Sequence, residues 1–522
     1  MLKRKTIITL FSIFCLAWFM QAQSEEQNLS LSLDDCIAKA LKNNLGVAIA
    51  VLGPEISEIA VRQANEKFIP SLSFNAGKQD TNQASYSWLD SRGSLNSSKN
   101  DTYSTQISQL IPFGGNLSVS LSNSKYDTNR TGTTINPRFS SQLRFNFTQP
   151  LLRDFGLKMT RREIIVAKNQ LQMSETDLQQ SLQNTVYSVE EAYWNLVYAI
   201  ENLKVNQQSL KLAEDLLEKN RRGVEVGTYA PIEIVTAQAQ VASREAEILA
   251  AEVQVRNMED RLKNIINLAA DTPGSGIVRI IPKDSPSYEQ KEISLDEALA
   301  IAMENRPDLM SSRIGLKNTE IDLDFAKNQT LPELSLQASY WSPGVSGDQL
   351  IYPPGIPFGD PIDVIPGGVG DSFKDVFGFK YKNWSIDLTL NVPLSNFLSK
   401  AALARAKVNL EQARLQLKNQ EQTIFTDLKI AVRNVETNFK RIQALKIARE
   451  LAEKQLEAEE EKLKVGLTTN YQVLSIQRDL SSQRTQEISA IIDYNLSLAA
   501  LNRDMGISLK EKNIRISDLL ED

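Results

Sequence analysis

Side chains that usually carry enzymatic chemistry are scarce in this sequence. Its 522 residues include no histidine and only two cysteines, Cys15 and Cys36. The missing imidazole excludes a Ser-His-Asp triad, a histidine-containing zinc site and a histidine general base. The chain has no phosphate-binding loop, cysteine pair or calcium loop, and its Asp and Glu residues are scattered as on a solvated surface. We therefore expect no enzymatic activity, no cofactor and no metal site.

Two short segments are the better candidates for a functional site. They read VGTYAPIEIVTAQ at 226–238 and VGLTTNYQVLSIQ at 465–477. Each follows a long helix-forming stretch, and a glycine at such a turn permits a positive φ and the close approach of a partner. A simple helix-terminating glycine explains either segment equally well alone. The occurrence of the pair at equivalent points of the chain is the stronger signal.

These equivalent points belong to an internal repeat. LSLDDCIAKALKNN at 31–44 matches ISLDEALAIAMENR at 293–306, with an offset of 262 residues. Both halves then run in the same order: a helix, a proline-led β section, a very long helix, the VG turn and another helix. We therefore divide the chain into a first repeat at 23–270, a linker at 271–292, a second repeat at 293–506 and a C-terminal tail at 507–522.

The N-terminus predicts export. Lys3, Arg4 and Lys5 precede an apolar run of 14 residues from Ile7 to Met20, too short for a bilayer-spanning helix. We interpret residues 1–22 as a signal peptide. Its removal takes away Cys15, so no intramolecular disulfide is expected. Since no other segment reaches the length of a transmembrane helix, we expect any membrane insertion to use β-strands.

Each half begins with a predicted helix of roughly 30 residues, capped near Asp34 or Asp296 and ended by Pro70 or Pro332. Apolar residues then alternate with polar ones, as in Leu72, Phe74 and Ala76. This period of two is the weak signature of an outer-membrane barrel strand. For any one strand, the half-buried strand of a soluble sandwich is the simpler interpretation. Four such strands in an exported chain favour the barrel.

The sequence between these strands predicts surface loops at 87–103 and 342–371, because the first is rich in Ser, Asn and Asp and the second in Pro and Gly. Alternating residues at 104–122 indicate an additional hairpin in the first half. The sequence leaves open whether this hairpin joins the barrel.

The longest helices are predicted at 157–222 and 397–465, each followed by a second helix at 232–268 or 471–505. A helix of nearly 70 residues is about 100 Å long. Such helices pack as antiparallel coiled-coil hairpins rather than as a globular core.

Four strands, or six with the extra hairpin, are too few to close a barrel in lipid. Three copies would supply 12 or 18 strands and would also arrange the helical hairpins in a ring. The predicted fold is an α+β membrane protein: a trimeric outer-membrane β-barrel continuous with a long periplasmic antiparallel coiled-coil α-barrel, built from an internal duplication.

The signal peptide, the duplication, the long helices and the paired tips resemble the TolC family of outer-membrane efflux and secretion channels. The resemblance implies a homotrimer with a 12-stranded barrel in outer-membrane lipid and a periplasmic extension. It also implies docking of the helix tips on a periplasmic adaptor (membrane fusion) protein, which is coupled to an inner-membrane RND pump or ABC exporter. The residues carried over as docking tips are Gly227, Thr228, Pro231, Gly466, Leu467, Thr468 and Thr469. The barrel-helix junctions are Pro70, Pro150, Pro332 and Pro393.

The family's tip pattern, VG-x4-DVL-x-A, is only partly kept. Some relatives close the entrance with a ring of aspartates at the second tip, and here Gln472 and Ser475 occupy those places. Glu233, in the first tip, is the acidic candidate for an entrance gate. The alternative interpretation is that Glu233 only interacts with the positive end of its helix.

The resemblance implies passive conduction as the outer-membrane component of a tripartite efflux or type I secretion system. No nucleic-acid partner is expected at a net charge of −6. The alternative function is a trimeric surface-anchored structural or adhesin protein with a coiled-coil stalk, which predicts a single, usually terminal, anchor. The substrate does not follow from the sequence, since selection of the cargo belongs largely to the inner-membrane partner.

Overall fold

The computed structural model describes residues 28–85, 95–268, 278–355, 360–395 and 397–516. The predicted signal peptide at 1–22 lies outside these residues. The chain forms two compact units, and each takes segments from both repeats. We call them the helical unit (Met1–Glu55, Met173–Arg313 and Gln416–Asp522) and the sheet unit (Ile56–Gln172 and Ile314–Leu415). Neither repeat forms a compact unit by itself.

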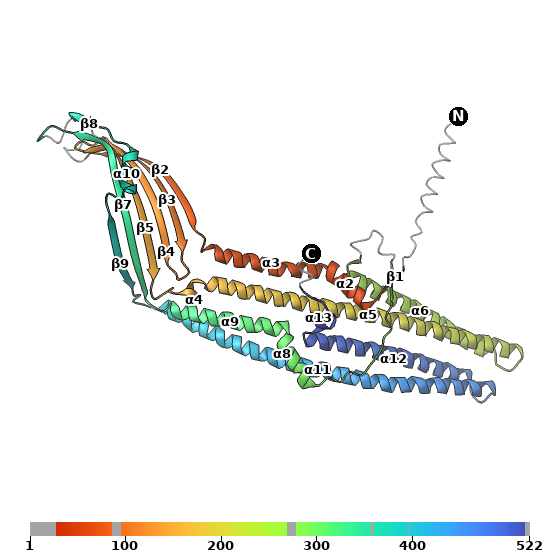
Figure 1. Ribbon diagram of the computed structural model, residues 1–522. Coiled ribbons are helices and arrows are strands. Elements are labelled where there is room, and N and C mark those ends of the chain that lie inside the picture. The colour runs from red at the N-terminus through yellow and green to blue at the C-terminus, as the bar shows by residue number, and fades with distance from the viewer. Residues whose placement is uncertain (1–27, 86–94, 269–277, 356–359, 396, 517–522) are drawn as a thin grey trace, which may run out of the picture. The chain divides into compact units, whose positions relative to one another are not determined.

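The sheet unit contains an antiparallel sheet with strands from both repeats (Figure 1). Five of its strands run in the order β2-β3-β4-β5-β7, while β8 and β9 share the other edge of β7, so the sheet is six strands wide. The extra hairpin thus belongs to the sheet as β3 and β4. The strands are β2 (Ser71–Ala84), β3 (Leu95–Leu110), β4 (Asn116–Thr128), β5 (Ile135–Pro150), β7 (Glu333–Ile351), β8 (Asp363–Ile365) and β9 (Asn383–Asn391).

The described parts of the two segments predicted as loops contain strands and the start of a helix, so that prediction was wrong there. β3 begins at Leu95, inside 87–103, and 342–371 contains the end of β7, all of β8 and the start of helix α10 (Val369–Phe377). Pro343 does not end β7, because β9 pairs only with Glu333–Trp341 and β8 only from Gln349 onward. Between these two partners one edge of β7 is free, and a proline is tolerated there.

The two faces of the sheet differ sharply in polarity. One row of cross-strand partners is apolar throughout and consists of Leu72, Ile107, Val119, Phe145, Tyr340 and Trp384. The adjacent row lies on the opposite face and consists of Ser71, Ser108, Ser118, Asn146, Ser339 and Ser385. We call the first face the apolar face. Its side chains are largely exposed, at 70% for Trp384 and 64% for Leu388.

The helices also repeat between the two halves. The longest, α5 and α11, have 64 and 68 residues and confirm the predicted rods, although Arg161 separates a short α4 from α5. The first half has α2 (Leu33–Asn43), α3 (Leu45–Glu66), α4 (Leu157–Thr160), α5 (Arg162–Glu225) and α6 (Ile232–Ile265). The second half has α8 (Leu295–Asn305), α9 (Pro307–Asn328), α11 (Phe397–Lys464) and α12 (Asn470–Asp504), with α13 (Ser508–Glu511) after it.

Each predicted helix of 30 residues is broken into two. Asn44 adopts an extended conformation between α2 and α3, and its side-chain oxygen accepts the N–H of Gly46 at 2.7 Å, which starts the next helix. Arg306 is extended between α8 and α9, since the following Pro307 disfavours a helical residue before it. The N-caps are Ser32 and Ser294, and the aspartates lie in the first turns.

Two tyrosines anchor the inter-repeat linker to the helical unit. The Tyr193 hydroxyl donates to the Asp284 carboxylate at 2.9 Å, and the Tyr494 hydroxyl donates to the carbonyl of Glu289. Each tyrosine is almost fully buried in the core of its own repeat. The strands β1 (Asn28–Leu31) and β6 (Arg279–Pro282) pair in parallel at the start of the linker.

No single helix among the described residues is long and apolar enough to cross a membrane. The pair α2 and α3, bent by 52° at its break, reaches that length and composition only when the two helices are taken together.

Candidate functional site

Both predicted tips are tight turns at the ends of helical hairpins in the helical unit (Figure 1). Gly227 has φ +81° and Gly466 has φ +75°, a region that costs other residues about 1–2 kcal/mol. Apart from the glycine and its two chain neighbours, no atom of the described residues lies within 4 Å of the position that a Cβ would take at Gly227 or Gly466. The backbone conformation therefore requires glycine there, while the space beside both turns is open.

The second tip is fixed by its own side chains. Thr469 caps α12, and its hydroxyl accepts the N–H of Gln472 at 3.4 Å. Thr468 donates to the carboxylate of Glu459, which also pairs with Lys462 at 3.1 Å. These contacts lower the pKa of Glu459, and the hydrogen bond from Thr468 is the largest cause. Leu467 is left 77% exposed at the end of the turn.

The first tip depends on two residues that the sequence interpretation missed. A Cβ at Gly223 would lie 2.2 Å from Cδ2 of the Tyr229 ring, which folds back onto the helix end. Thr228 donates to the Gly223 carbonyl with both its N–H, at 2.8 Å, and its hydroxyl, at 2.9 Å. The sequence contained a signal for this contact, because Gly223 is the only glycine in the helix-forming stretch that became α5. Pro231 is the N-cap residue of α6, which begins at Ile232.

Apolar side chains surround the glycine turns and remain in solvent. A monomer gains nothing from exposing large apolar residues together, and such groups mark contact surfaces. Both tips carry them. The exposed residues are Val226, Ile232, Val235, Val465, Leu467 and Tyr471, and each is at least 58% accessible.

The two tips are joined by one polar contact. The Asn470 side-chain amide donates to Oε2 of Glu233 at 3.1 Å, and Asn220 donates to the Glu233 carbonyl at 3.3 Å. Asn220 and Asn470 are buried, and the side-chain oxygen of each lacks a hydrogen-bond partner among the described groups. We call these three residues the tip joint. Gln472 is exposed and Ser475 is half-buried, so of the three predicted gate residues only Glu233 lies in this joint.

A line of polar contacts continues from the tip joint along the two hairpins. We call it the polar seam. It pairs Ser209 with Ser481 at 3.0 Å, Gln208 with Arg484 at 3.1 Å and Asn202 with Thr485 at 3.2 Å. All three pairs run from α5 to α12.

Charged residues support the seam from α11. The Arg484 guanidinium donates to the Glu453 carboxylate at 2.9 Å, and Arg449 pairs with both Glu453 and Glu487. The Arg484 hydrogen bond is the main cause that lowers the pKa of Glu453, with Arg449 adding to it against partial desolvation. The α12 side of the seam is therefore held to α11 by ionised groups.

The four predicted junction prolines lie at ends of strands or beside them in the sheet unit. Pro70 and Pro332 immediately precede β2 and β7, Pro150 is the last residue of β5, and Pro393 lies between β9 and α11. Each stands where a strand and a helix adjoin in the sequence, and a proline there prevents either element from continuing through the other.

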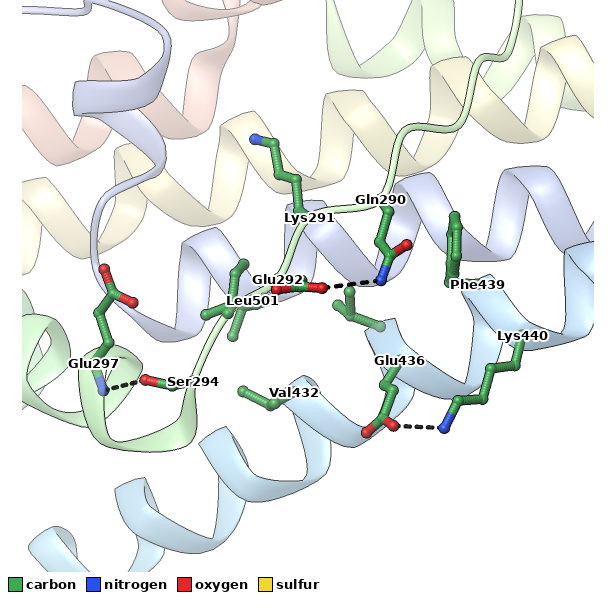
Figure 2. A pocket seen from close by; sticks show the side chains of 12 residues that line it. Gln290, Lys291, Glu292, Ser294, Glu297, Val432, Glu436, Phe439, Lys440 and Leu501 are labelled. Carbon is green, nitrogen blue, oxygen red and sulfur yellow. Dashed lines mark hydrogen bonds and ion pairs between the residues drawn. The ribbon is translucent and has the colours of Figure 1, made fainter.

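The described grooves do not coincide with the tips. One groove of about 570 Å³ lies beneath the linker and is lined by residues of the linker, α8, α11 and α12 (Figure 2). Two pairs of its polar side chains contact each other, Gln290 with Glu292 and Glu436 with Lys440. Within the described ranges, no three His, Cys, Asp or Glu side chains converge as a metal site would require.

Comparison with known proteins identifies the family. Residues 116–268 and 298–506 match the family model described as outer membrane efflux protein. The outer membrane protein TolC of Vibrio cholerae serotype O1 is 23% identical over 301 residues, which is 57% of this chain and 62% of that protein. This alignment therefore spans less than two thirds of the relative's length.

Solved structures share the fold. A membrane protein from Pseudomonas aeruginosa superposes with a TM-score of 0.63 at 17% identity and covers 91% of this chain and 93% of its own. The outer membrane protein VceC from Vibrio cholerae gives a TM-score of 0.62 at 15% identity, over 91% of this chain and 96% of its own. The chain thus belongs to the outer membrane efflux protein family and is a protein of the bacterial outer membrane with a periplasmic extension.

Proposed function

We propose that three copies of this chain form one channel that conducts substrates passively across the outer membrane. The observation that carries this proposal is the polarity of the sheet. An apolar row of Leu, Ile, Val, Phe, Tyr and Trp on one face, exposed at four of its six positions, suits lipid. A row of Ser and Asn on the other face suits a water-filled lumen. A soluble sandwich would cover its apolar face with a second layer.

The open edges of the sheet support assembly. β2 pairs only with β3, and β9 pairs only with β7, so each leaves one edge without a partner in the described chain. Open edges are not tolerated in lipid, and pairing β2 of one copy with β9 of the next would remove them. Three sheets that are each six strands wide would supply about 18 strands. This is the larger of the two numbers expected from the sequence.

We propose that the tips dock on a periplasmic adaptor coupled to an inner-membrane RND pump or ABC exporter. The glycine turns have open space beside them, and the exposed residues Val226, Leu467 and Tyr471 offer an apolar surface. Thr468 and Thr469 hold the second turn in one conformation. A preorganised apolar surface binds a partner with little loss of conformational entropy.

The tip joint and the polar seam are the proposed closing contacts. They link the two hairpins of one chain through hydrogen bonds between groups that water can solvate when the hairpins separate. A small buried apolar cluster, which includes Leu216 of the first hairpin and Leu456 and Leu480 of the second, also joins the hairpins. The unpartnered oxygens of Asn220 and Asn470 weaken the joint further, because each buried unsatisfied group costs about 1–3 kcal/mol. Adaptor binding would then favour the open arrangement by differential affinity. Gln472 and Ser475 flank the joint in sequence and add no charge.

The proposed activity involves no bond chemistry, and its energy comes from the inner-membrane partner. The adhesin alternative predicted a single terminal anchor. The sheet instead takes β2 to β5 from the first repeat and β7 to β9 from the second. This distribution favours a channel.

Substitutions at the second tip test the docking proposal. We expect Gly466→Arg, Thr468→Lys and Thr469→Lys to abolish export in cells, since each places bulk or charge on the docking surface, while the trimer remains intact on native gels. Thr423→Lys adds the same charge at an exposed position of α11 and is the matched control. Normal export by the three tip variants, with the trimer intact, would count against tip docking.

A further inference from the structure

Helix α10 covers part of the apolar face of the sheet. The Ser372 hydroxyl lies 2.7 Å from that of Ser141 on β5, and the Ser342 hydroxyl on β7 donates to the Val376 carbonyl at 2.9 Å. Ser141 shares a face with Phe145, which is four residues away on β5, and Ser342 shares that face with Tyr340, which is two residues away on β7. Figure 1 shows α10 against these strands, toward the end where β8 lies.

The sheet provides a shaped seat for this helix. A Cβ at Gly344 would lie 2.0 Å from the Ser372 carbonyl oxygen, so only glycine lets α10 approach this closely. Ser141, Ser342 and Ser372 are each at most 2% exposed. The apolar face thus changes locally to small residues where the helix sits, which indicates a fixed position rather than a loosely attached loop.

The free side of α10 is apolar and aromatic. Val369, Phe373 and Phe377 follow one another at intervals of four residues, and the two phenylalanine rings stack at 6.2 Å. Phe377 is 58% exposed. Just beyond the helix, the Phe379 ring lies 6.1 Å from Tyr340, whose ring lies 6.5 Å from Phe145. The aromatic side chains of the sheet therefore continue onto α10.

The helix sits where the apolar face ends. On the same face, the row beyond Ser141 and Gly344 contains Lys78, Asp101, Lys125 and Phe139. Charged residues next to aromatic ones mark the level of lipid headgroups. α10 itself carries Lys374, while Lys380, which follows the helix, pairs with Asp375 at 3.1 Å.

We propose that α10 is an interfacial anchor, which inserts Phe373 and Phe377 into the outer surface of the lipid bilayer. The partner is lipid, because α10 extends an apolar face that the proposed channel presents to lipid, and because a short amphipathic helix with phenylalanines on one side and charged residues on the other is typical of binding at a bilayer surface. This inference rests on the proposed function only in taking the apolar face as lipid-facing.

Spin labels on single cysteines, in the full chain reconstituted into lipid vesicles, test the anchor. Collision with oxygen reports lipid, and collision with a water-soluble nickel chelate reports water. Phe377→Cys probes the anchor, Leu388→Cys is the reference on the apolar face, and Asp371→Cys is the reference on the charged side of α10. Burial raises the pKa of the Cys36 thiol to about 12, so we expect it to stay unlabelled, and the unsubstituted chain gives the background.

We expect labels at 377 and 388 to favour oxygen at least about threefold over the label at 371, with 377 shallower than 388. A label at 377 that matches 371, while 388 reports lipid, would overturn the anchor and leave the channel proposal intact. A label at 377 shielded from both reagents would also overturn it, since a second copy would then cover α10. A label at 388 that favours the chelate would instead contradict the lipid-facing sheet.

Discussion

The side-chain amide of Asn470 donates a hydrogen bond to the Glu233 carboxylate across 3.1 Å, and these residues belong to different repeats. The contact joins the two hairpin tips directly, whereas the gate in some relatives is an aspartate ring at the second tip. In this chain the acidic partner is in the first repeat and a neutral amide is in the second. The hydrogen bond between Asn470 and Glu233 is thus the main polar contact between the tips in the proposed closed state.

Asn470→Asp should open the channel. The substitution replaces a donor by a second carboxylate, and losing a hydrogen bond to a charged group costs about 1.5–3 kcal/mol, at least about tenfold in a two-state equilibrium. We expect a corresponding rise in open probability in planar bilayers. Asn419→Asp adds the same charge at an exposed position of α11 and should leave the current unchanged.

A swapped pair provides the sharper control for the joint. In Glu233→Gln combined with Asn470→Asp, the amide and the carboxylate exchange sides, and the total charge equals that of the wild type. We expect this double variant to return toward the wild-type conductance. An open probability equal to that of Asn470→Asp alone would show that the bond between these two residues does not hold the tips.

Gly223→Ala should destabilise the first tip through Tyr229. The new methyl group would need space that the tyrosine ring fills, at a cost of about 1–3 kcal/mol. We expect a lower thermal midpoint and weaker export, and we expect Tyr229→Ala in the same chain to recover most of the midpoint. Gly315→Ala in α9 is the control, since nothing lies within 4 Å of its Cβ position and alanine favours helix there. Equal effects at 223 and 315 would exclude the proposed clash.

Acidification should weaken the polar seam only at low pH. Hydrogen bonding to Arg484 lowers the pKa of Glu453 below its ordinary value of 4.5. A carboxyl group with a depressed folded pKa stabilises the fold above its unfolded pKa, and this contribution is lost as the pH falls through the folded value. The thermal midpoint of the wild type should therefore exceed that of Glu453→Gln at pH 7, with the gap closing below pH 4.5. A gap that is unchanged at pH 3 would show that the ionised carboxylate does not stabilise this seam.

The sequence predicts the large elements because their causes are local. The uninterrupted helix formers between Phe397 and Lys464 leave no residue that could break the rod, and Pro70, Pro332 and Pro393 stand beside the strands that they were expected to mark. The breaks at Asn44 and Arg306 were not predicted. The first depends on a hydrogen bond from the Gly46 N–H to the Asn44 side chain. The second occurs because Pro307 begins helix α9.

The contacts of the site were harder to predict, because they join residues far apart in the sequence. Glu233 was identified as an acidic residue near a turn, but its partner Asn470 is 237 positions away. The sheet was also hard to predict, because its pairings join residues far apart in the sequence. Whether the hairpin at 104–122 joins the sheet depends on pairing with β2 and β5. Pro343 is tolerated in β7 only because one edge of that strand is free at this residue.

The placement of the extra hairpin in the sheet predicts a pattern of chemical reactivity along β4. Val119 lies on the apolar face and Ser120 on the polar face. In an assembled channel within vesicles, Ser120→Cys should react with a charged, membrane-impermeant thiol reagent at least about tenfold faster than Val119→Cys, since thiolates form and react in water. On β5, Phe145→Cys and Arg144→Cys are the matched slow and fast controls, because they pair directly with Val119 and Ser120. If both β4 positions react rapidly while the β5 pair keeps its contrast, the hairpin lies outside the lipid-embedded sheet and the channel has fewer than 18 strands.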